Sequence, residues 1–257
     1  MKKLSLILLA LICTIGAQAQ FGKKLLKKGN VDAGKKLVKA ATLSDEDMAQ
    51  LSLESVTWMD ENNPVAQPGD PYADRLNNLI KDLKIDPDLD LNFKVYVVSD
   101  INAFATPDGS VRVMAGLMDL MTDDEVLSVI GHEIGHVKLG HSKKRYKTAY
   151  GVSAARDLAT ANTGAGAIIA DDQMGGFVEN VLNAQFSQSN ESSSDEYGFK
   201  WMVENNLNYR GMEGAFAKLA ELSGDGGKGS LTSSHPGSKK RSERAKKWAD
   251  KEDQKKE

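Results

Sequence analysis

Residues 129–136 read Val-Ile-Gly-His-Glu-Ile-Gly-His, and the apolar sequence around them predicts a helix. Thr122 is a suitable N-cap for this helix, and Glu125, three residues later, completes a capping box. The two aspartates between them lie where the positive end of the helix dipole favours acids. Glycine follows Leu139, and glycine commonly ends a helix. The sequence therefore predicts one helix that begins after Thr122, runs to about Leu139 and stops at Gly140.

His132, Glu133 and His136 form an H-E-x-x-H arrangement in the middle of this helix. Residues four apart lie one above the other on a helix, so both imidazoles can reach one Zn²⁺ at about 2.0–2.1 Å. Glu133 lies beside them and can reach a water molecule bound to the metal. The pentapeptide also arises by chance, with the histidines hydrogen-bonded in a core. The zinc interpretation is preferred because three polar side chains in an apolar helix are costly to bury without a partner.

Two glycines, Gly131 and Gly135, interrupt the same helix. Each weakens a helix interior by about 1 kcal/mol relative to alanine, so each needs a reason to be there. We expect them to allow the backbone of another element to approach closely.

The third metal ligand must come from elsewhere, because a catalytic zinc commonly has three protein ligands and one open position. His141 is one candidate, but the extended zincin signature requires histidine one residue later, where this chain has Ser142. Among the glutamates of the next predicted helical region, only Glu191 is followed four residues later by an acid, Asp195. One helix could then present a ligand and a carboxylate that orients a metal-bound imidazole. The alternative is that both acids are solvated helix residues.

The rest of the chain predicts further helices and a small sheet. Residues 72–83 and 177–205 have helical character, whereas residues 150–176 show only weak periodicity. Residues 93–98 and 110–114 are rich in β-branched and aromatic side chains, and a Pro-Asp-Gly turn precedes the second segment. These two segments predict an antiparallel pair of strands. The expected fold is α+β and mostly helical, with a small antiparallel sheet.

The chain has 257 residues, with 33 Lys and Arg against 36 Asp and Glu. This balance favours a folded globule and argues against nucleic acid as a partner. Residues 1–19 combine two lysines, a short apolar run and a small-residue end, which predicts a cleavable signal peptide. The only cysteine, Cys13, would leave with that peptide. We therefore expect an exported protein without disulfides, in the periplasm or outer cell envelope of a bacterium.

Residues 21–40 contain seven lysines interleaved with apolar residues. This pattern allows peripheral contact with anionic lipid headgroups, although a solvated helix or frayed terminus explains it more simply. We interpret residues 20–69 as an N-terminal extension and linker, residues 70–245 as the main domain, and residues 246–257 as a charged C-terminal tail.

Five short motifs occur in a fixed order along the main domain. They are Asn102-Ala103-Phe104-Ala105-Thr106-Pro107-Asp108-Gly109, then Gly116-Leu117, then Val129 to His136, then Glu191 to Gly198, then His235-Pro236 with Arg241. Together they resemble the HtpX and CAAX-prenyl-protease family of gluzincin metallopeptidases, and most closely its small periplasmic members without transmembrane helices.

The resemblance implies a zinc endopeptidase with a zincin-like core and one Zn²⁺ per chain. His132, His136 and Glu191 would hold the metal, and Glu133 would be the general base. Asp195 would support the site by orienting a ligand. Water activated by the metal would attack the peptide bond, so no acyl-enzyme is expected.

The resemblance also implies roles for two other motifs. The segment Asn102, Ala103, Phe104 and Ala105 would lead into an edge strand that pairs with extended substrate. His235 would donate to the oxyanion, with Arg241 supporting the site. Since pairing at an edge strand involves the backbone, we expect broad action on unfolded or flexible polypeptides.

The chain departs from the family pattern at three positions. Ser193 and Ser194 stand where Glu and Ala are usual, and Gln188 stands where arginine is common. None of these removes a ligand, but they put local packing and substrate preference in doubt.

Two alternative functions that are not enzymatic remain open. One is a non-catalytic zinc-binding envelope protein, although closed structural zinc sites are usually rich in cysteine. The other is a membrane-surface adaptor that acts through residues 21–40 and would keep its activity without zinc.

Overall fold

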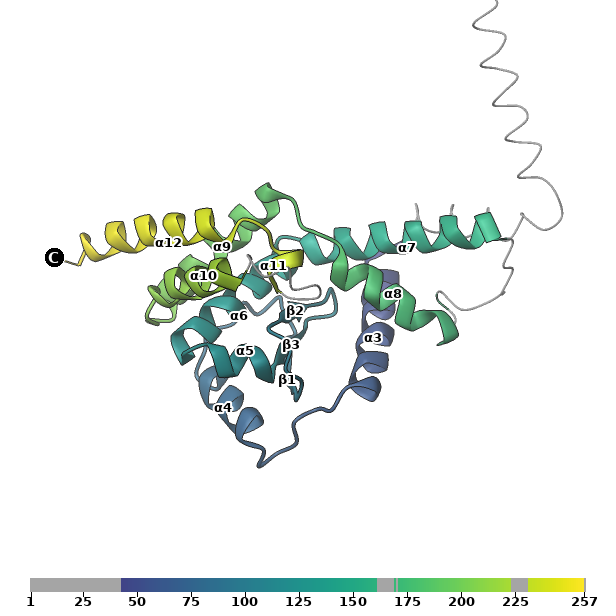
Figure 1. The fold of residues 1–257 in the computed structure, drawn as a ribbon, viewed down its shortest axis with the longest axis horizontal. Helices are drawn as coiled ribbons and strands as arrows, with labels where there is room; N and C mark the ends of the chain where they lie inside the picture. The colour runs from purple at the N-terminus through teal and green to yellow at the C-terminus, as the bar shows by residue number, and fades with distance from the viewer. Residues whose placement is uncertain (1–42, 161–168, 170, 223–230, 257) are drawn as a thin grey trace, which may run out of the picture.

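The computed structural model describes residues 43–160, 169, 171–222 and 231–256. Helices dominate this part of the chain, and a three-stranded sheet lies near its centre (Figure 1). The predicted α+β class is therefore confirmed. The elements in chain order are α3 (Asp45–Asn62), α4 (Pro71–Ile80), β1 (Asn92–Tyr96), β2 (Ala103–Ala105), β3 (Ser110–Met114), α5 (Ala115–Leu120), α6 (Asp123–Lys138), α7 (His141–Thr160), α8 (Asp171–Asn183), α9 (Gln188–Glu204), α10 (Gly211–Leu222), α11 (Leu231–Ser234) and α12 (Ser238–Asp253).

The sheet has the strand order β1-β3-β2 and is mixed. β1 runs parallel to β3, with Asn92 opposite Ser110 and Tyr96 opposite Met114, whereas β2 runs antiparallel to β3. The predicted antiparallel pairing of β1 with β3 is therefore wrong. The Pro-Asp-Gly turn, where Gly109 has a φ of +92°, joins β3 to the short β2. β2 takes the antiparallel place beside β3, so β1 pairs with the other side of β3.

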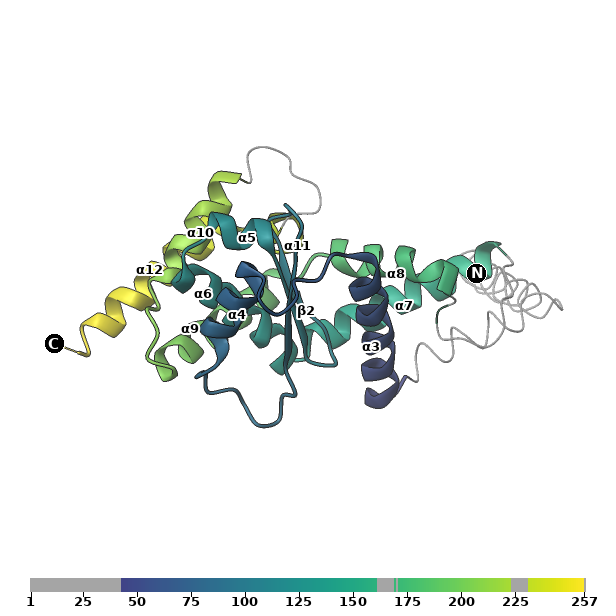
Figure 2. The same cartoon turned by 90° about the horizontal axis from the view of Figure 1, so that it is seen from below.

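Alternate side chains of the sheet face two separate hydrophobic clusters. On one side, Val95, Ala103 and Val113 pack with residues of α6, α9, α10 and α12. On the other side, Tyr96 and Phe104 pack with residues of α3, α7 and α8. Figure 2 shows these two groups of helices on opposite sides of the sheet. The sheet thus joins two helical layers, each with its own apolar core.

A partly buried ion pair fixes α3 to the sheet. Arg112, only 1% exposed, donates from Nε and Nη2 to Asp60 at 2.8 and 3.0 Å. Lys94 and Tyr96 donate to the same carboxylate, each at 2.7 Å. Burial raises the pKa of Asp60, but these donors outweigh it and lower the pKa to about 2. Part of the expected N-terminal extension is therefore built into the fold as α3.

α6 and α9 cross in close contact at Gly131 and Gly135. The free-energy cost of these glycines predicted the close approach of another element, and α9 is that element. A Cβ atom at Gly131 would lie 2.7 Å from Cε3 of Trp201, and one at Gly135 would lie 3.0 Å from the carbonyl oxygen of Ser194. Because these positions carry no side chain, the backbone of α9 packs directly against the H-E-x-x-H segment.

The predicted ends of α6 are confirmed. The helix begins after Thr122, whose side chain forms a capping box with Glu125, and it ends at Lys138. Gly140 has a positive φ of +72° just beyond it. Both ends are set by local chemistry.

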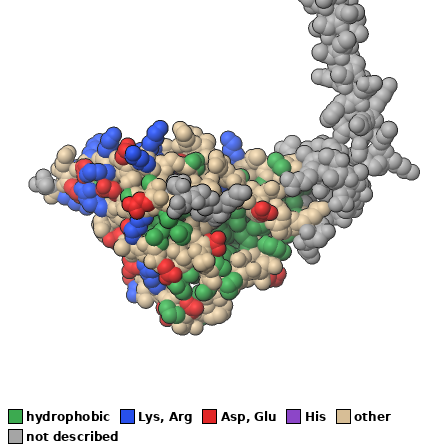
Figure 3. All heavy atoms as spheres, viewed as in Figure 1, with side chains coloured by type: hydrophobic (Ala, Val, Ile, Leu, Met, Phe, Trp, Pro, Cys, Tyr) green, Lys and Arg blue, Asp and Glu red, His purple; other side chains and the backbone are tan. Residues whose placement is uncertain are grey.

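Three other segments differ from expectation. α7 extends to Thr160 despite weak periodicity, and the predicted helical region 177–205 is divided into α8 and α9 by residues 184–187. The expected charged tail, residues 246–257, instead continues α12 as far as Asp253. Ala249 of this part is buried and Trp248 packs against the core, which holds the helix in place. Figure 3 shows Lys and Arg side chains gathered at the left of the view, over α12.

Residues 1–42, with the predicted signal peptide and the basic segment 21–40, lie outside the described residues, as do residues 224–229. Within the described ranges, no helix has the length and apolar character needed to cross a membrane.

Candidate metal centre

Four side chains bring possible metal ligands together beside the α6–α9 crossing. Nε2 of His132 lies 3.0 Å from Nε2 of His136, which lies 3.3 Å from Oε1 of Glu191. Nδ1 of His235 lies 3.1 Å from Nε2 of His132 and 3.0 Å from Oε1 of Glu191. All four residues are at most 2% exposed. One ligand atom from each lies within 4.8 Å of the others.

Three separate segments position these side chains. α6 supplies His132 and His136 one turn apart, and the first turn of α9 supplies Glu191. His235 follows α11, and its backbone N–H donates to the carbonyl of Leu231 at 2.9 Å. The structure thus brings together the three ligands inferred for the metal, and it adds His235 to them.

The spacing and chemistry of the cluster fit a metal ion. Ligand atoms around a tetrahedral ion with bonds of about 2.0–2.1 Å lie about 3.3 Å apart, close to the separations of 3.0–3.3 Å here. Burial, together with the neighbouring His132, holds the pKa of His136 well below its usual value, so its ring is neutral. Neutral imidazole is the form that binds metal.

Glu191 is ionised in this site. Burial raises the pKa of its carboxyl, but His235 and the hydrogen bond from His136 outweigh burial and hold the pKa far below its ordinary value. A carboxylate among imidazoles is a donor set that suits Zn²⁺ better than hard cations, which prefer oxygen ligands alone.

A second set of contacts holds the ligands in orientation. Nδ1 of His132 lies 2.8 Å from Oδ1 of Asp195. Arg241 donates to Asp195 from Nε at 3.0 Å and from Nη2 at 2.6 Å, and its Nη1 lies 2.7 Å from Oε2 of Glu191. Arg244 also contacts Asp195. Burial raises the pKa of Asp195, but Arg241 and His132 outweigh this effect and lower the pKa below its ordinary value, so the carboxylate stays charged.

Glu133 lies beside the cluster with one carboxylate oxygen unsatisfied. The residue is 2% exposed, and no group among the described residues donates a hydrogen bond to its Oε1. Nε2 of His235 is 3.5 Å from that atom. A buried carboxylate oxygen that no protein group satisfies is costly, so this atom can accept a hydrogen bond from a group that enters the site.

β2 is the edge strand of the sheet beside α6. Backbone bonds from Met114 to Asn102 and from Thr106 to Ser110 turn these even-numbered residues toward β3. The backbone groups of Ala103 and Ala105 therefore face the outer edge. Asn102 Oδ1 accepts from the N–H of Ala103, and Ser142 Oγ donates to the carbonyl of Ala105. Phe104 points into the second hydrophobic cluster.

The structure also places two residues around the cluster whose position sequence reasoning did not predict. The ring of Phe186 stacks on His136, with centroids 3.8 Å apart and an interplanar angle of 26°. The guanidinium of Arg145 lies over the same ring, with Cζ 4.3 Å from the ring centroid. His141, which the sequence argued against as a ligand, lies with Nδ1 3.2 Å from Nδ1 of His136 and 3.1 Å from Oγ of Ser194, outside the convergent set. No local pattern marks Phe186 or Arg145.

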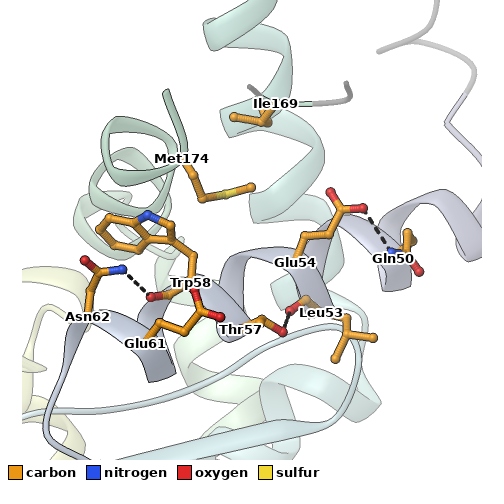
Figure 4. Close-up of a pocket in the computed structure, with 9 residues that line it drawn as sticks. All are labelled: Gln50, Leu53, Glu54, Thr57, Trp58, Glu61, Asn62, Ile169 and Met174. Carbon is orange, nitrogen blue, oxygen red and sulfur yellow. Dashed lines mark hydrogen bonds between the residues drawn. The ribbon is translucent and has the colours of Figure 1, made fainter. Parts of the chain in front are cut away.

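A separate hollow lies between α3 and α8 (Figure 4). Trp58, Met174 and Ile169 give it an apolar wall, and Glu54 and Glu61 lie along α3. Among the described residues, its lining contains neither histidine nor cysteine.

Comparison with known proteins gives one consistent family. The model for peptidase family M48 matches residues 72–249. Metalloprotease YcaL of Escherichia coli (strain K12) is 39% identical over 215 residues, which cover 83% of this chain and 84% of that protein. Metalloprotease LoiP of the same strain is 37% identical over 219 residues, 84% of this chain and 85% of that protein. Protease HtpX of Actinobacillus pleuropneumoniae serotype 5b (strain L20) is 44% identical over 50 residues, 18% of this chain and 17% of that protein.

Proposed function

The chain belongs to peptidase family M48, and from this premise we propose that it is a zinc endopeptidase that hydrolyses unfolded or flexible polypeptides in the bacterial cell envelope. The relatives confirm the resemblance to HtpX-type metallopeptidases, and metal-dependent proteolysis follows from them. The observation that carries the proposal is the convergence of His132, His136 and Glu191, with Glu133 beside them.

We assign the metal to three protein ligands. His132 and His136 would bind through Nε2, and Glu191 through its carboxylate, because these atoms converge. When bound, zinc lowers the pKa of a water molecule towards about 7 and polarises the scissile carbonyl. Asp195 and Arg241 keep the ligands oriented, and both are buried.

Glu133 is the proposed general base. Its Oε1 has no hydrogen-bond donor among the described residues, so it is free to accept a proton from water. It would then deliver that proton to the leaving amine, as a single carboxylate can serve both steps. His235 would donate a hydrogen bond to the developing oxyanion, and its proximity to Glu133 supports this role.

We propose that substrates pair with the outer edge of β2 as extended chains. Ala103 and Ala105 present backbone groups there, although Asn102 and Ser142 already occupy one group each. Backbone pairing requires a segment without its own secondary structure, which favours unfolded or flexible polypeptides.

The cellular location is part of the proposal and rests on residues 1–40. The predicted signal peptide would export the chain, and the lysines of residues 21–40 would allow peripheral contact with an anionic membrane.

One experiment tests the proposed function. The mature protein is incubated with casein, with and without a chelator, alongside a Glu133→Gln variant. We expect cleavage by the wild type, loss of cleavage on chelation and recovery with zinc. Glu133→Gln should retain one zinc per chain but lose at least about 10²–10⁴-fold in rate, because the amide keeps the shape but not the base.

The outcome also separates the alternatives. A wild-type protein that binds zinc but cuts neither casein nor any other unfolded polypeptide would favour a metal-binding scaffold. A protein that binds vesicles equally well without metal, and cleaves nothing, would favour the membrane-surface adaptor.

A further inference from the structure

A small cavity with a basic lining lies next to the metal centre. It has a volume of about 210 Å³ and is formed by α7, the α8–α9 connection and the start of α9. Lys144 and Arg145 contribute two positive charges, and the described lining contains no carboxylate. Ligand pockets for drug-sized molecules are larger, at about 300–1,000 Å³, so this cavity suits a single small group.

Arg145 lacks a charge partner at this cavity. The residue is 8% exposed, and among the described residues no carboxylate forms an ion pair with it and no acceptor bonds its buried Nε. Burial lowers the pKa of its guanidinium, and Glu133, Tyr146 and Glu191 offset this only through longer-range charge. The guanidinium group of an arginine nevertheless stays protonated in proteins, so Arg145 keeps its positive charge. A buried, charged group with unused donors is costly unless something binds it.

The cavity is close enough to the metal centre to receive part of a substrate. Phe186 separates the two sites: one face stacks on His136, and Arg145 lies over the same ring. His141 lines the cavity and also contacts His136. A polypeptide bound at the metal centre therefore has residues within reach of Arg145.

The start of α9 adds to the positive character of the cavity. Ser187, the N-cap, and Asn190 line it, so the positive end of a long helix faces the same space. Asn190 and Gln185 contribute side-chain amide groups to the lining. The cavity thus combines a planar guanidinium, an ammonium and neutral donors, which is the chemistry that binds carboxylate.

We infer that this cavity is a specificity subsite for a substrate carboxylate, with Arg145 as its principal donor. The carboxylate would be an aspartate or glutamate side chain near the scissile bond or the free C-terminus of the substrate. This inference rests on the proposed peptidase function and narrows its substrate class to polypeptides with an acidic group near the cleavage site.

Peptide cleavage tests the subsite. A quenched fluorogenic peptide is prepared with glutamate or glutamine at each position around the scissile bond in turn, and a second pair carries a free or an amidated C-terminus. We expect the zinc-loaded wild type to prefer the carboxylate form at one position by roughly tenfold in kcat/KM. A buried charge-assisted hydrogen bond to Arg145 forms with the carboxylate and is weaker with the neutral amide. A ratio near one at every position and at the C-terminus overturns the inference without any variant.

Variants then assign the preference to Arg145. Arg145→Gln should abolish the preference, bringing the ratio of kcat/KM for the two peptides close to one, and Arg145→Lys should keep part of it. Lys147→Gln removes a cation of the same helix outside the cavity and should leave the preference intact. If Arg145 merely supports Phe186, Arg145→Gln will lower cleavage of both peptides alike, and the inference is wrong.

A binding measurement keeps this test independent of proteolysis. Fluorescently labelled glutamate and glutamine peptides are titrated against zinc-loaded Glu133→Gln protein, with and without Arg145→Gln. Tighter binding of the glutamate peptide that disappears with Arg145→Gln supports the subsite even if the wild type cleaves nothing, a result that would refute only the proposed function. Equal binding of both peptides refutes the subsite itself.

Discussion

Nδ1 of His132 lies 2.8 Å from Oδ1 of Asp195, and this contact turns the other ring nitrogen, Nε2, toward the metal ligands. Asp195 follows Glu191 by one helical turn on α9, so one helix supplies both a ligand and the group that orients another ligand. A carboxylate in this place also raises the basicity of the imidazole. The metal affinity of the site should therefore depend on a residue that does not touch the metal.

We predict that Asp195→Asn weakens zinc binding by roughly 10–100-fold, because the amide loses the charge that polarises His132. Competition with a chelating dye measures the affinity. Glu196→Gln is the matched control: Glu196 is adjacent but exposed, and its ion-pair partner among the described residues is Lys200. Unchanged zinc affinity in Asp195→Asn would show that the orientation of His132 is held by packing alone. Thermal melts of both variants check that the fold is intact, since Arg241 and Arg244 also contact Asp195.

A second prediction concerns His235, whose Nδ1 lies among the ligand atoms while its Nε2 faces Glu133. If it stabilises the oxyanion, His235→Ala should lower kcat by about 10²–10³ and leave KM and zinc content nearly unchanged. Zinc content should hold because His132, His136 and Glu191 are sufficient for a catalytic zinc site. Arg241→Ala should act in the same direction but more weakly. If His235→Ala instead keeps activity within about twofold of the wild type, the loss is far smaller than expected, and His235 does not stabilise the oxyanion.

Asp60 allows a prediction about acid stability. Asp60→Asn should destabilise the protein by about 3–5 kcal/mol at pH 7, because it leaves Arg112 buried without its partner. Urea unfolding measures the loss, and Glu61→Gln, an exposed neighbour on α3, is the control.

The same variant has a defined pH dependence. The pKa of Asp60 is about 2 in the folded protein and near its ordinary value of 3.8 in the unfolded chain. Its contribution to stability is therefore complete above about pH 4 and is lost as the pH falls toward about 2. The difference in unfolding free energy between wild type and Asp60→Asn should shrink over that interval. A difference that stays constant from pH 7 to pH 2 would contradict the assignment.

The sequence predicted the parts of the site that depend on local chemistry. The capping box at Thr122 and the glycine at 140 define α6, and the four-residue spacing of His132 and His136 follows from helix geometry. The close approach of another backbone was also predictable, because Gly131 and Gly135 weaken a helix unless another backbone needs the space, but that this element is α9 was not.

Non-local contacts were not predictable in the same way. β2 reads Ala-Phe-Ala, three residues with one strand-favouring side chain, so its place beside β3 leaves almost no local signal. His235 reaches the ligand cluster only because α11 and α12 set the path of the chain there. Arg145 stands in a run with Lys143, Lys144 and Lys147, which is typical of a solvated basic helix face, yet it is buried and lies over the Phe186 ring.

The final prediction tests whether the α6–α9 crossing controls the metal centre. A Cβ atom at Gly198 would lie 2.8 Å from the backbone nitrogen of His132 and 2.9 Å from the carbonyl carbon of Gly131. Backbone atoms cannot yield as a flexible side chain can, so Gly198→Ala should push α9 away from α6. We expect a loss of about 1–3 kcal/mol in unfolding free energy, typical of overpacking, together with weaker zinc binding as Glu191 moves from the histidines. Gly176→Ala is the control, because a Cβ there meets nothing within 4 Å and alanine favours a helix by up to about 1 kcal/mol. Urea unfolding of the metal-free variants and zinc titration measure the two effects separately. If Gly198→Ala were destabilised but bound zinc as tightly as the wild type, the ligand geometry would be independent of the distance between the two helices.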